Sequence, residues 1–320
     1  PSTSTLILLQ ISAYLIVLWL LAPGARRVFY CHFPDQLLAE HKTVLQQLYR
    51  WPFDMFEEWC TGFAHLILVN SAFTASMFSK TFPTLTSARG LPRVLYPCVD
   101  VGEEVEWTHR RGDGFVLLSI NRFERKKGLD RALEGLAALR DLDEKLFDKT
   151  QLILAGGYDP RVRENVEYHQ ELKNMCKELD LDVEDVSDPS ESDAKVVLVR
   201  SFSDELKRTM LQSATAVIYT PSNEHFGIVP LEAAAASRPV IAVASGGPLE
   251  TVEAEAGDSQ TGVLVPEPPT PKEWAVAIAQ VLDRDGEKAQ TLGQNARRRV
   301  LDTFSRDAFG NKLDAFVREA

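Results

Sequence analysis

Two glutamates, Glu224 and Glu232, stand eight positions apart in the stretch TPSNEHFGIVPLEAAAASRPVIAVASGGP. Carboxylates accept hydrogen bonds from neutral hydroxyl groups, such as those of a ribose or a sugar ring. Between them, Phe226 to Val229 lie where a loop becomes a helix, with Pro230 in the first turn, where its missing N–H costs nothing. Free amides and the positive end of the helix dipole favour an anion there. The pattern predicts a site that holds an anion beside hydroxyl groups.

A cationic cluster stands out against the formal net charge of -11, since four of the six residues from Arg122 to Lys127 are cationic. The donor fork of Arg and the point charge of Lys both suit a diphosphate. Taken alone, the cluster could equally be a solvated turn. The overall negative charge repels nucleic acid, so we expect no nucleic-acid partner.

Three further features are weaker evidence for a ligand site when each is taken alone. Gly246 and Gly247 form a glycine turn that suits close backbone approach. His32, in YCHFPD, is on its own a strand-end histidine with an ordinary hydrogen bond. Asn70 is expected to cap the helix that follows it. The glutamates could also have structural roles only. Glu232 could interact with the positive end of the helix dipole, and Glu224 could be a solvated loop residue.

Short β-branched runs alternate with longer helical patterns, which is typical of parallel sheets with crossover helices. Ligands of such sheets lie at the carboxyl ends of the strands, and both the cationic cluster and Glu224 directly follow predicted strands. The predicted strands are residues 27–33, 66–71 and 93–97 in the first group, and 115–120, 151–156, 195–201, 216–221, 239–245 and 261–266 in the second.

The length of 320 residues favours two domains, and the polar stretch from Asp100 to Gly114 is the predicted linker. We expect an α/β fold with two Rossmann-like domains. Residues 1–105 form the first domain, which has few strands. Residues 106–320 form the second domain, with the carboxyl-terminal helices packing back on it. The acidic segment 180–195 is expected to be a mobile surface insertion.

The amino end, Pro1 to Ala25, carries no charged residue. Its apolar run, Thr5 to Ala22, nearly reaches the roughly 20 residues that a membrane span needs. Gln10 and Ser12 would also suit a buried core helix, so membrane contact and a core helix both stay open. No basic residue precedes the run, which disfavours a signal peptide. A chain that starts with Pro rather than Met suggests a fragment.

We expect no metal and no cofactor. The pairs Asp141-x-Asp143 and Asp180-x-Asp182 resemble a metal-binding signature, but neither follows a strand, so both are assigned to surface charge. The four cysteines lie far apart without a CxxC pair, which argues against a zinc site or a disulfide framework and fits a reducing compartment. They are Cys31, Cys60, Cys98 and Cys176.

Taken together, these motifs resemble the donor site of retaining glycosyltransferases with two Rossmann domains, the GT-B superfamily. Within it, FYCHFPD, LVNSAFTASMF, INRFERKKGL and SNEHFGIVPLEAAAASRPVIAVASGGPLETV look like the α-1,3/1,6-mannosyltransferases of dolichol-linked oligosaccharide assembly. The resemblance extends from about Gln10 to the carboxyl end. Complete members carry a further strand and a glycine-rich loop before the region where this sequence begins, so the resemblance implies that residues 1–105 are a partial, truncated acceptor-side domain. It also implies that residues 106–320 are the donor nucleotide-sugar-binding domain.

The resemblance implies a retaining transfer of mannose from GDP-mannose to a dolichol-diphosphate-linked mannosyl-chitobiose, first α-1,3 and then α-1,6. It places the catalytic body on the cytosolic face of the endoplasmic reticulum membrane, with other mannosyltransferases of the pathway as partners. The acceptor hydroxyl would attack the face from which GDP leaves. Fixed cations and a helix terminus can stabilise the departing diphosphate, each donor contributing a few kcal/mol in a dry site.

Carried over by residue, the resemblance implies that Arg122 and Lys127 bind the donor diphosphate. Glu232 would hold the ribose hydroxyls, Glu224 would orient the transferred mannose, and His32 would meet that sugar from the opposite wall. His225 is expected to shape the site rather than act as a base. The remaining donor-binding positions are the amides of Phe226, Gly227, Ile228 and Val229 and the sugar-pocket glycines Gly246 and Gly247.

Three alternatives belong to other classes. A GT-B enzyme with a different acceptor would share the donor site, and a non-catalytic scaffold of glycan assembly would keep the fold without binding GDP. A nicotinamide-dependent dehydrogenase is disfavoured, because no GxGxxG follows a strand with an acidic residue about 20 positions later.

Overall fold

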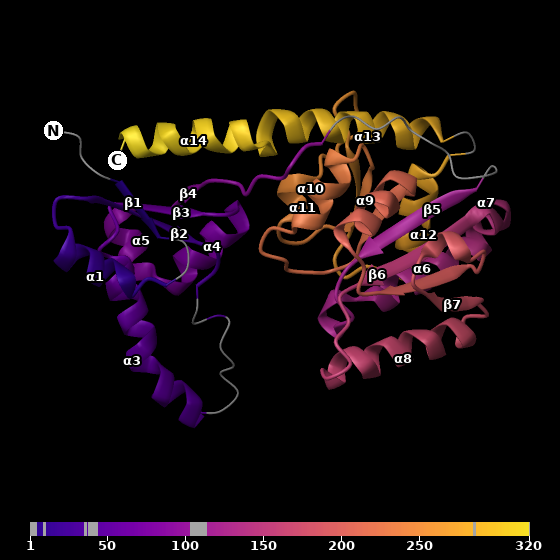
Figure 1. Ribbon diagram of the computed structural model, residues 1–320, viewed down its shortest axis with the longest axis horizontal. Coiled ribbons are helices and arrows are strands. Elements are labelled where there is room, and N and C mark those ends of the chain that lie inside the picture. Colours follow the sequence, from indigo (N-terminus) through magenta and orange to yellow (C-terminus); the bar gives the residue numbers. More distant parts are fainter. Residues whose placement is uncertain are drawn as a thin grey trace. The chain divides into compact units, whose positions relative to one another are not determined.

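The computed structural model describes residues 5–8, 11–34, 37, 44–102, 114–283 and 286–319. Its contacts divide the chain into two compact units, which are coloured along the sequence in Figure 1. The first contains Pro1–Cys98 and Arg306–Ala320, and the second contains Val99–Ser305. Most of the predicted linker, residues 103–113, lies outside the described residues, so the predicted boundary between residues 105 and 106 stays a prediction.

The second unit contains a seven-stranded parallel sheet in the order β11-β10-β9-β5-β6-β8-β7. The six strands predicted for this part are all confirmed, most of them with slightly shorter ends. Their residues are almost entirely buried, as expected where helices cover both faces of a parallel sheet. The strands are β5 (Phe115–Ile120), β6 (Thr150–Gly156), β7 (Val183–Val186), β8 (Val196–Arg200), β9 (Ala216–Tyr219), β10 (Val240–Val243) and β11 (Gly262–Val265).

The additional strand, β7, corrects one prediction. It lies inside the acidic segment 180–195, which is therefore not a mobile insertion. β7 pairs in parallel with β8 at the edge of the sheet, and Arg200 Nε donates to Asp185 Oδ1 at 3.0 Å. Val183 and Val186 pack on opposite faces of the sheet. An edge strand needs few apolar side chains to pack on the sheet, here two valines, because its acidic side chains can remain in contact with water.

Helices cover both faces of this sheet, as in a doubly wound fold (Figure 1). One face packs against α6 (Leu129–Leu142), α7 (Glu144–Lys149), α8 (Arg163–Glu178), α12 (Pro271–Val281) and α13 (Glu287–Arg299). The other packs against α9 (Asp204–Ser213) and α10 (Ile228–Ala235). A short helix, α11 (Pro248–Thr251), follows β10, and a π-helical turn, Val300–Phe304, follows α13. The predicted α/β class is confirmed.

The first unit contains a four-stranded parallel sheet in the order β1-β2-β3-β4. The three strands predicted here are confirmed, although the last is only two residues long. Residues of α1, α4 and α5 pack on one face of the sheet. The elements are β1 (Thr5–Leu8), α1 (Tyr14–Leu21), β2 (Arg26–Cys31), α3 (Val44–Thr61), β3 (Leu66–Val69), α4 (Ala72–Thr81), α5 (Pro83–Arg89) and β4 (Arg93–Val94).

The last helix, α14 (Arg306–Glu319), is grouped with this first unit, although the sequence placed it with the second domain. Its apolar stripe, with Phe309, Leu313 and Phe316, packs on the face of the sheet opposite α4 and α5. Helical periodicity predicts such a stripe but does not identify the sheet that it covers.

The described residues of the uncharged amino end do not form one continuous helix. They form β1, which pairs in parallel with β2, and then the eight-residue helix α1, while residues 9–10 lie outside the described residues. Leu15 is fully buried in the core of the unit, whereas Leu20 and Leu21 are exposed. Within the described parts of the chain, no helix is long and apolar enough to cross a membrane.

Candidate functional site

The strand order of the second unit has its topological switch point between β5 and β9. The chain passes from β5 to β6 on one side and later returns to β9 on the other. Open α/β sheets bind ligands at the carboxyl ends of the two strands that flank such a point. The loops at these ends are residues 121–128 and 220–227, which contain the predicted cationic cluster and Glu224.

Direct hydrogen bonds join these two loops. Thr220 Oγ1 donates to the carbonyl oxygen of Lys127 at 2.7 Å. Arg131, on the first turn of α6, donates from Nη1 to the carbonyl oxygen of Thr220 at 3.2 Å and to Ser222 Oγ at 2.7 Å. Gly128 has a φ of 60°, in the left-handed region, and caps α6. The structure therefore brings together the two motifs that the sequence singled out separately.

Lys127 and Glu224 form an ion pair, with 2.5 Å between Nζ and Oε1. The Lys127 side chain is only 13% exposed, so its ammonium group is partly withdrawn from water. Arg122 differs, because its side chain is 64% exposed and pairs with Glu124 at 3.0 Å. The two predicted diphosphate ligands thus lie on one loop, one directed at Glu224 and one at the surface.

The other two cations of the cluster are engaged elsewhere. Arg125 Nη2 lies 2.6 Å from Glu171 Oε1 on α8, and Lys126 Nζ lies 3.0 Å from Glu124 Oε2. Asn165 Nδ2 donates to the carbonyl oxygen of Phe123, whose side chain is fully buried. The loop is therefore held against α8, and among these contacts Lys127 is the cation of the cluster that pairs with Glu224.

The amino end of α10 has the geometry that the sequence predicts for an anion site. Gly227 precedes the helix with a φ of 78°, and a Cβ there would lie 3.1 Å from Tyr219 Oη. Glycine has no side chain, and α10 has no side-chain cap at this end. A helix end of this kind can bind an anion through its first amides. Anion binding by Phe226, Gly227, Ile228 and Val229 stays a prediction.

Glu232 lies one turn into the same helix. Lys207 Nζ, on α9, is 2.6 Å from Glu232 Oε1. The other oxygen, Oε2, is buried and makes no hydrogen bond within the part of the chain that the structure describes. Sequence reasoning missed Lys207, because it lies inside a helix and not directly after a strand, and no short-range spacing links it to Glu232.

The glycine turn packs against the glutamate loop itself. A Cβ on Gly246 would lie 2.3 Å from the carbonyl oxygen of Glu224, and one on Gly247 would lie 1.8 Å from that of Phe226. Gly247 N donates to the Glu224 carbonyl oxygen at 2.9 Å. The close backbone approach predicted here is thus between two loops of the protein, while contact of these glycines with a sugar stays a prediction.

Two histidines accompany the predicted site residues. Burial is the main cause that lowers the pKa of His225, beside Glu224, so its ring is neutral near pH 7. His32 directly follows β2 in the first unit, as predicted, and its ring packs edge-on against Tyr30 with centroids 4.9 Å apart. Partial burial lowers its pKa. Its approach to a transferred sugar stays a prediction.

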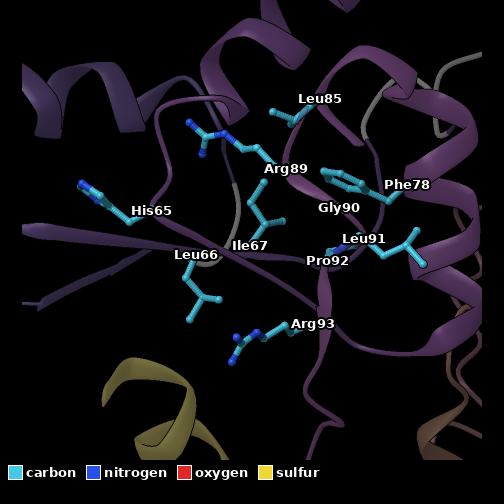
Figure 2. A pocket seen from close by; sticks show the side chains of 10 residues that line it. All are labelled: His65, Leu66, Ile67, Phe78, Leu85, Arg89, Gly90, Leu91, Pro92 and Arg93. Carbon is cyan, nitrogen blue, oxygen red and sulfur yellow. The ribbon is translucent and has the colours of Figure 1, made fainter. Parts of the chain in front are cut away.

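Two cavities are lined by other parts of the chain, although Arg125 of the loop 121–128 borders one of them. Figure 2 shows one of about 210 Å³, lined by His65, Leu66, Arg89 and Arg93 among others. His65 directly precedes β3 and Arg93 begins β4, so this cavity lies at the amino ends of the strands, opposite the edge where such sheets bind ligands. The other, of about 570 Å³, is an open groove between α6 and α8. Neither contains a predicted site residue.

The described residues contain no cluster of three His, Cys, Asp or Glu side chains that could hold a metal ion. Asp143 caps α7 by accepting a hydrogen bond from Leu146 N at 3.0 Å, and Asp180 follows the end of α8. That the protein works without a metal ion stays a prediction.

Asn70 was predicted to cap the helix that follows it. Ser71 caps α4 instead, accepting a hydrogen bond from Thr74 N at 2.9 Å.

Residues 102–299 match the family model described as glycosyl transferases group 1. The chain is 45% identical over 316 residues to the alpha-1,3/1,6-mannosyltransferase ALG2 of Homo sapiens, covering 96% of this chain and 71% of that protein. The Mus musculus ALG2 is 43% identical with the same coverage. The chain belongs to the α-1,3/1,6-mannosyltransferase family. It is a glycosyltransferase, as predicted, and it also shares 38% identity over 320 residues with ALG2 of Saccharomyces cerevisiae.

Solved structures agree on the fold. Sucrose-phosphate synthase from Thermosynechococcus elongatus superposes with a TM-score of 0.67 at 23% identity, covering 98% of this chain and 73% of that one. Anabaena Alr3699/HepE in complex with UDP and glucose gives 0.67 at 18%, covering 98% and 78%. The predicted GT-B fold of two Rossmann-like domains is confirmed for this mannosyltransferase family member.

Proposed function

We propose that this chain transfers mannose from GDP-mannose to a dolichol-diphosphate-linked mannosyl-chitobiose, α-1,3 and then α-1,6, with retention of configuration. The observation that carries the proposal is the junction at the switch point. There, Lys127 and Glu224, from loops that follow different strands, form an ion pair, and α10, which has no side-chain cap at its amino end, begins at Ile228, four positions after that glutamate. One region thus offers cations and amides for a diphosphate and carboxylates for sugar hydroxyls.

Departure of GDP is the step that these groups assist. The bond between the anomeric carbon of mannose and the diphosphate oxygen breaks, and negative charge grows on that oxygen. Lys127, Arg122 and the amides of Gly227 to Val229 stabilise this charge without a metal ion. The acceptor hydroxyl attacks the same face of the sugar and gives its proton to the departing phosphate.

The ion pair also couples Glu224 to binding of the donor. When the diphosphate arrives, it competes with the Glu224 carboxylate for the ammonium group of Lys127. The released carboxylate then accepts hydrogen bonds from mannose hydroxyls. Donor binding and orientation of the sugar are coupled in this way.

We propose further that the first unit contacts the endoplasmic reticulum membrane from its cytosolic face. α1 and the end of α3 expose an aromatic and aliphatic face, defined by Trp19, Leu20, Leu21, Phe56 and Trp59. The rings of Trp19 and Trp59 both pack on Phe63, with centroids 5.3 and 5.0 Å apart, so the two helices form one surface.

This surface is suited to contact with a lipid bilayer. Tryptophan rings prefer the region of the lipid headgroups, and exposed apolar patches mark interaction sites. The proposed acceptor is itself anchored by a lipid. With a net charge of -11, the chain gains little from anionic lipids, so the contact depends on apolar burial. Contact with other mannosyltransferases of the pathway stays a prediction.

A transfer assay tests the proposed function. The full-length protein is incubated with radiolabelled GDP-mannose and a defined lipid-linked mannosyl-chitobiose, and the linkages of the product are determined. We expect α-1,3 and α-1,6 mannose to be added. GDP binding without transfer to any lipid-linked acceptor would favour a scaffold, and transfer only to a different acceptor would favour another GT-B activity.

A further inference from the structure

The ion pair between Lys207 and Glu232 joins two helices, α9 and α10, that follow different strands of the second unit. Both side chains are about three-quarters buried, with exposures of 24% and 27%. A charge-assisted hydrogen bond in such surroundings is short and strong, and here the distance is 2.6 Å. Lys207 therefore fixes one oxygen of the carboxylate.

The position of Lys207 follows from the amphipathic pattern of α9. The helix begins after Ser203, whose hydroxyl group accepts a hydrogen bond from Leu206 N at 3.1 Å. Met210 and Leu211, three and four positions after Lys207, are buried in the core beneath the helix. Residues at these spacings share a face, so Lys207 is directed inward along the surface of the unit rather than into bulk water.

The second carboxylate oxygen, Glu232 Oε2, is buried and has no hydrogen-bond partner among the described residues. An unpaired buried acceptor is costly, and the cost is removed when a ligand hydroxyl donates to it. Since Oε1 is held by Lys207, Oε2 keeps a defined direction before any ligand arrives. This preorganisation lowers the entropy that a ligand loses on binding.

We propose that Lys207 is a positioning residue for the donor: it holds the Glu232 carboxylate so that Oε2 accepts a hydrogen bond from a ribose hydroxyl of GDP. The inference rests on the proposed function and deepens it. Lys207 acts through Glu232, and its effect on binding requires the ribose hydroxyls.

Calorimetric titration of the full-length protein with GDP and with 2′,3′-dideoxy-GDP tests this role. Lys207→Met is expected to weaken GDP binding about tenfold, the value of one charge-assisted hydrogen bond. For dideoxy-GDP, the variant and the wild type are expected to bind equally, because the ribose hydroxyls are missing. Lys207→Arg, which keeps the charge, should recover part of the loss.

Two controls separate positioning from other roles. Arg208→Met removes an exposed cation from the same helix, and it should leave both affinities unchanged. In a Glu232→Gln background, Lys207→Met should cause no further loss of GDP affinity. Equal melting temperatures of Lys207→Met and Arg208→Met would show that the fold is intact.

Unchanged GDP affinity of Lys207→Met would overturn the inference. So would an equal loss for GDP and dideoxy-GDP, because Lys207 would then act on the base or the diphosphate instead. If the wild type binds no GDP, the proposed function is wrong, and the positioning role of Lys207 is then wrong as well.

Discussion

The two units of this mannosyltransferase family member differ in what their helices expose. In the second unit, helices cover both faces of a seven-stranded sheet, and the loops at the switch point are joined by hydrogen bonds and close glycine contacts. In the first, α1 and α3 leave large apolar side chains exposed, with Leu21 at 80% and Trp59 at 57%. This difference accords with the proposed donor site in the second unit and with the proposed lipid contact of the first.

The largest effect is expected at Lys127. Replacing it with alanine removes a cation that stabilises the departing diphosphate, so the transfer rate should fall by about 100-fold, in the range found for single electrostatic donors. Lys126→Ala is the matched control, since that side chain is exposed and pairs with Glu124. Single-turnover mannose transfer measures both. Equal rates for the two variants would contradict the assignment of Lys127.

Glu232→Ala should act on binding rather than on rate. The variant loses an acceptor for ribose hydroxyls, and Lys207 loses its carboxylate partner. We expect roughly tenfold weaker GDP-mannose binding, with a smaller change in the maximal rate. Titration and saturation kinetics separate the two quantities, and a pure rate effect would argue against a ribose contact.

A pair of glycine substitutions compares the rigidity of the two units. Gly247→Ala puts a methyl group 1.8 Å from the Phe226 carbonyl oxygen, so the loops must separate, lowering the melting temperature by several degrees and weakening GDP binding. Gly310→Ala, on α14, meets nothing within 4 Å and replaces glycine inside a helix. It should leave stability unchanged or slightly higher. Scanning calorimetry reports both, and an unaltered Gly247→Ala protein would mean that these loops are not tightly held.

The apolar face of the first unit is expected to bind lipid vesicles. Replacing Trp19 and Trp59 with serine should reduce flotation with neutral phosphatidylcholine vesicles several-fold, because amphipathic rings no longer insert. Leu142→Ser, an exposed leucine of the second unit, is the control. Added salt should change little. Binding that requires anionic lipid and disappears at high salt would contradict an apolar contact.

The smallest effect is expected from pH. Partial burial lowers the pKa of His32 below its ordinary value of 6.5, so the ring is neutral near pH 7 and gains a proton only as pH falls below that value. If the neutral ring assists transfer, the rate should decline on this acid side, and His32→Gln should flatten the decline. If the variant shows the same decline in rate at acid pH, the decline is due to another group.

Much of the donor side could be predicted because its signals are local. Buried β-branched runs identified β5 and β9, and the residues that follow such strands meet at one edge of a parallel sheet. The pair Lys127–Glu224 follows from that rule, even though 97 positions separate the two residues.

Other features depend on tertiary contacts that no spacing records. Lys207 meets Glu232 only because α9 and α10 lie on the same face of the sheet. β7 was missed because an edge strand with two valines has too little apolar character to be distinguished from a solvated loop. The apolar amino end was expected to be one helix, since a run of aliphatic residues does not distinguish a helix from a strand followed by a short helix.

GDP is proposed to bind at the switch point between β5 and β9. A crystal structure of the full-length protein with GDP would test this position. The diphosphate is expected between the Lys127 ammonium group and the amides at the start of α10, with Glu224 displaced from Lys127 and a ribose hydroxyl on Glu232 Oε2. A diphosphate bound elsewhere, with the Lys127–Glu224 pair intact, would contradict it.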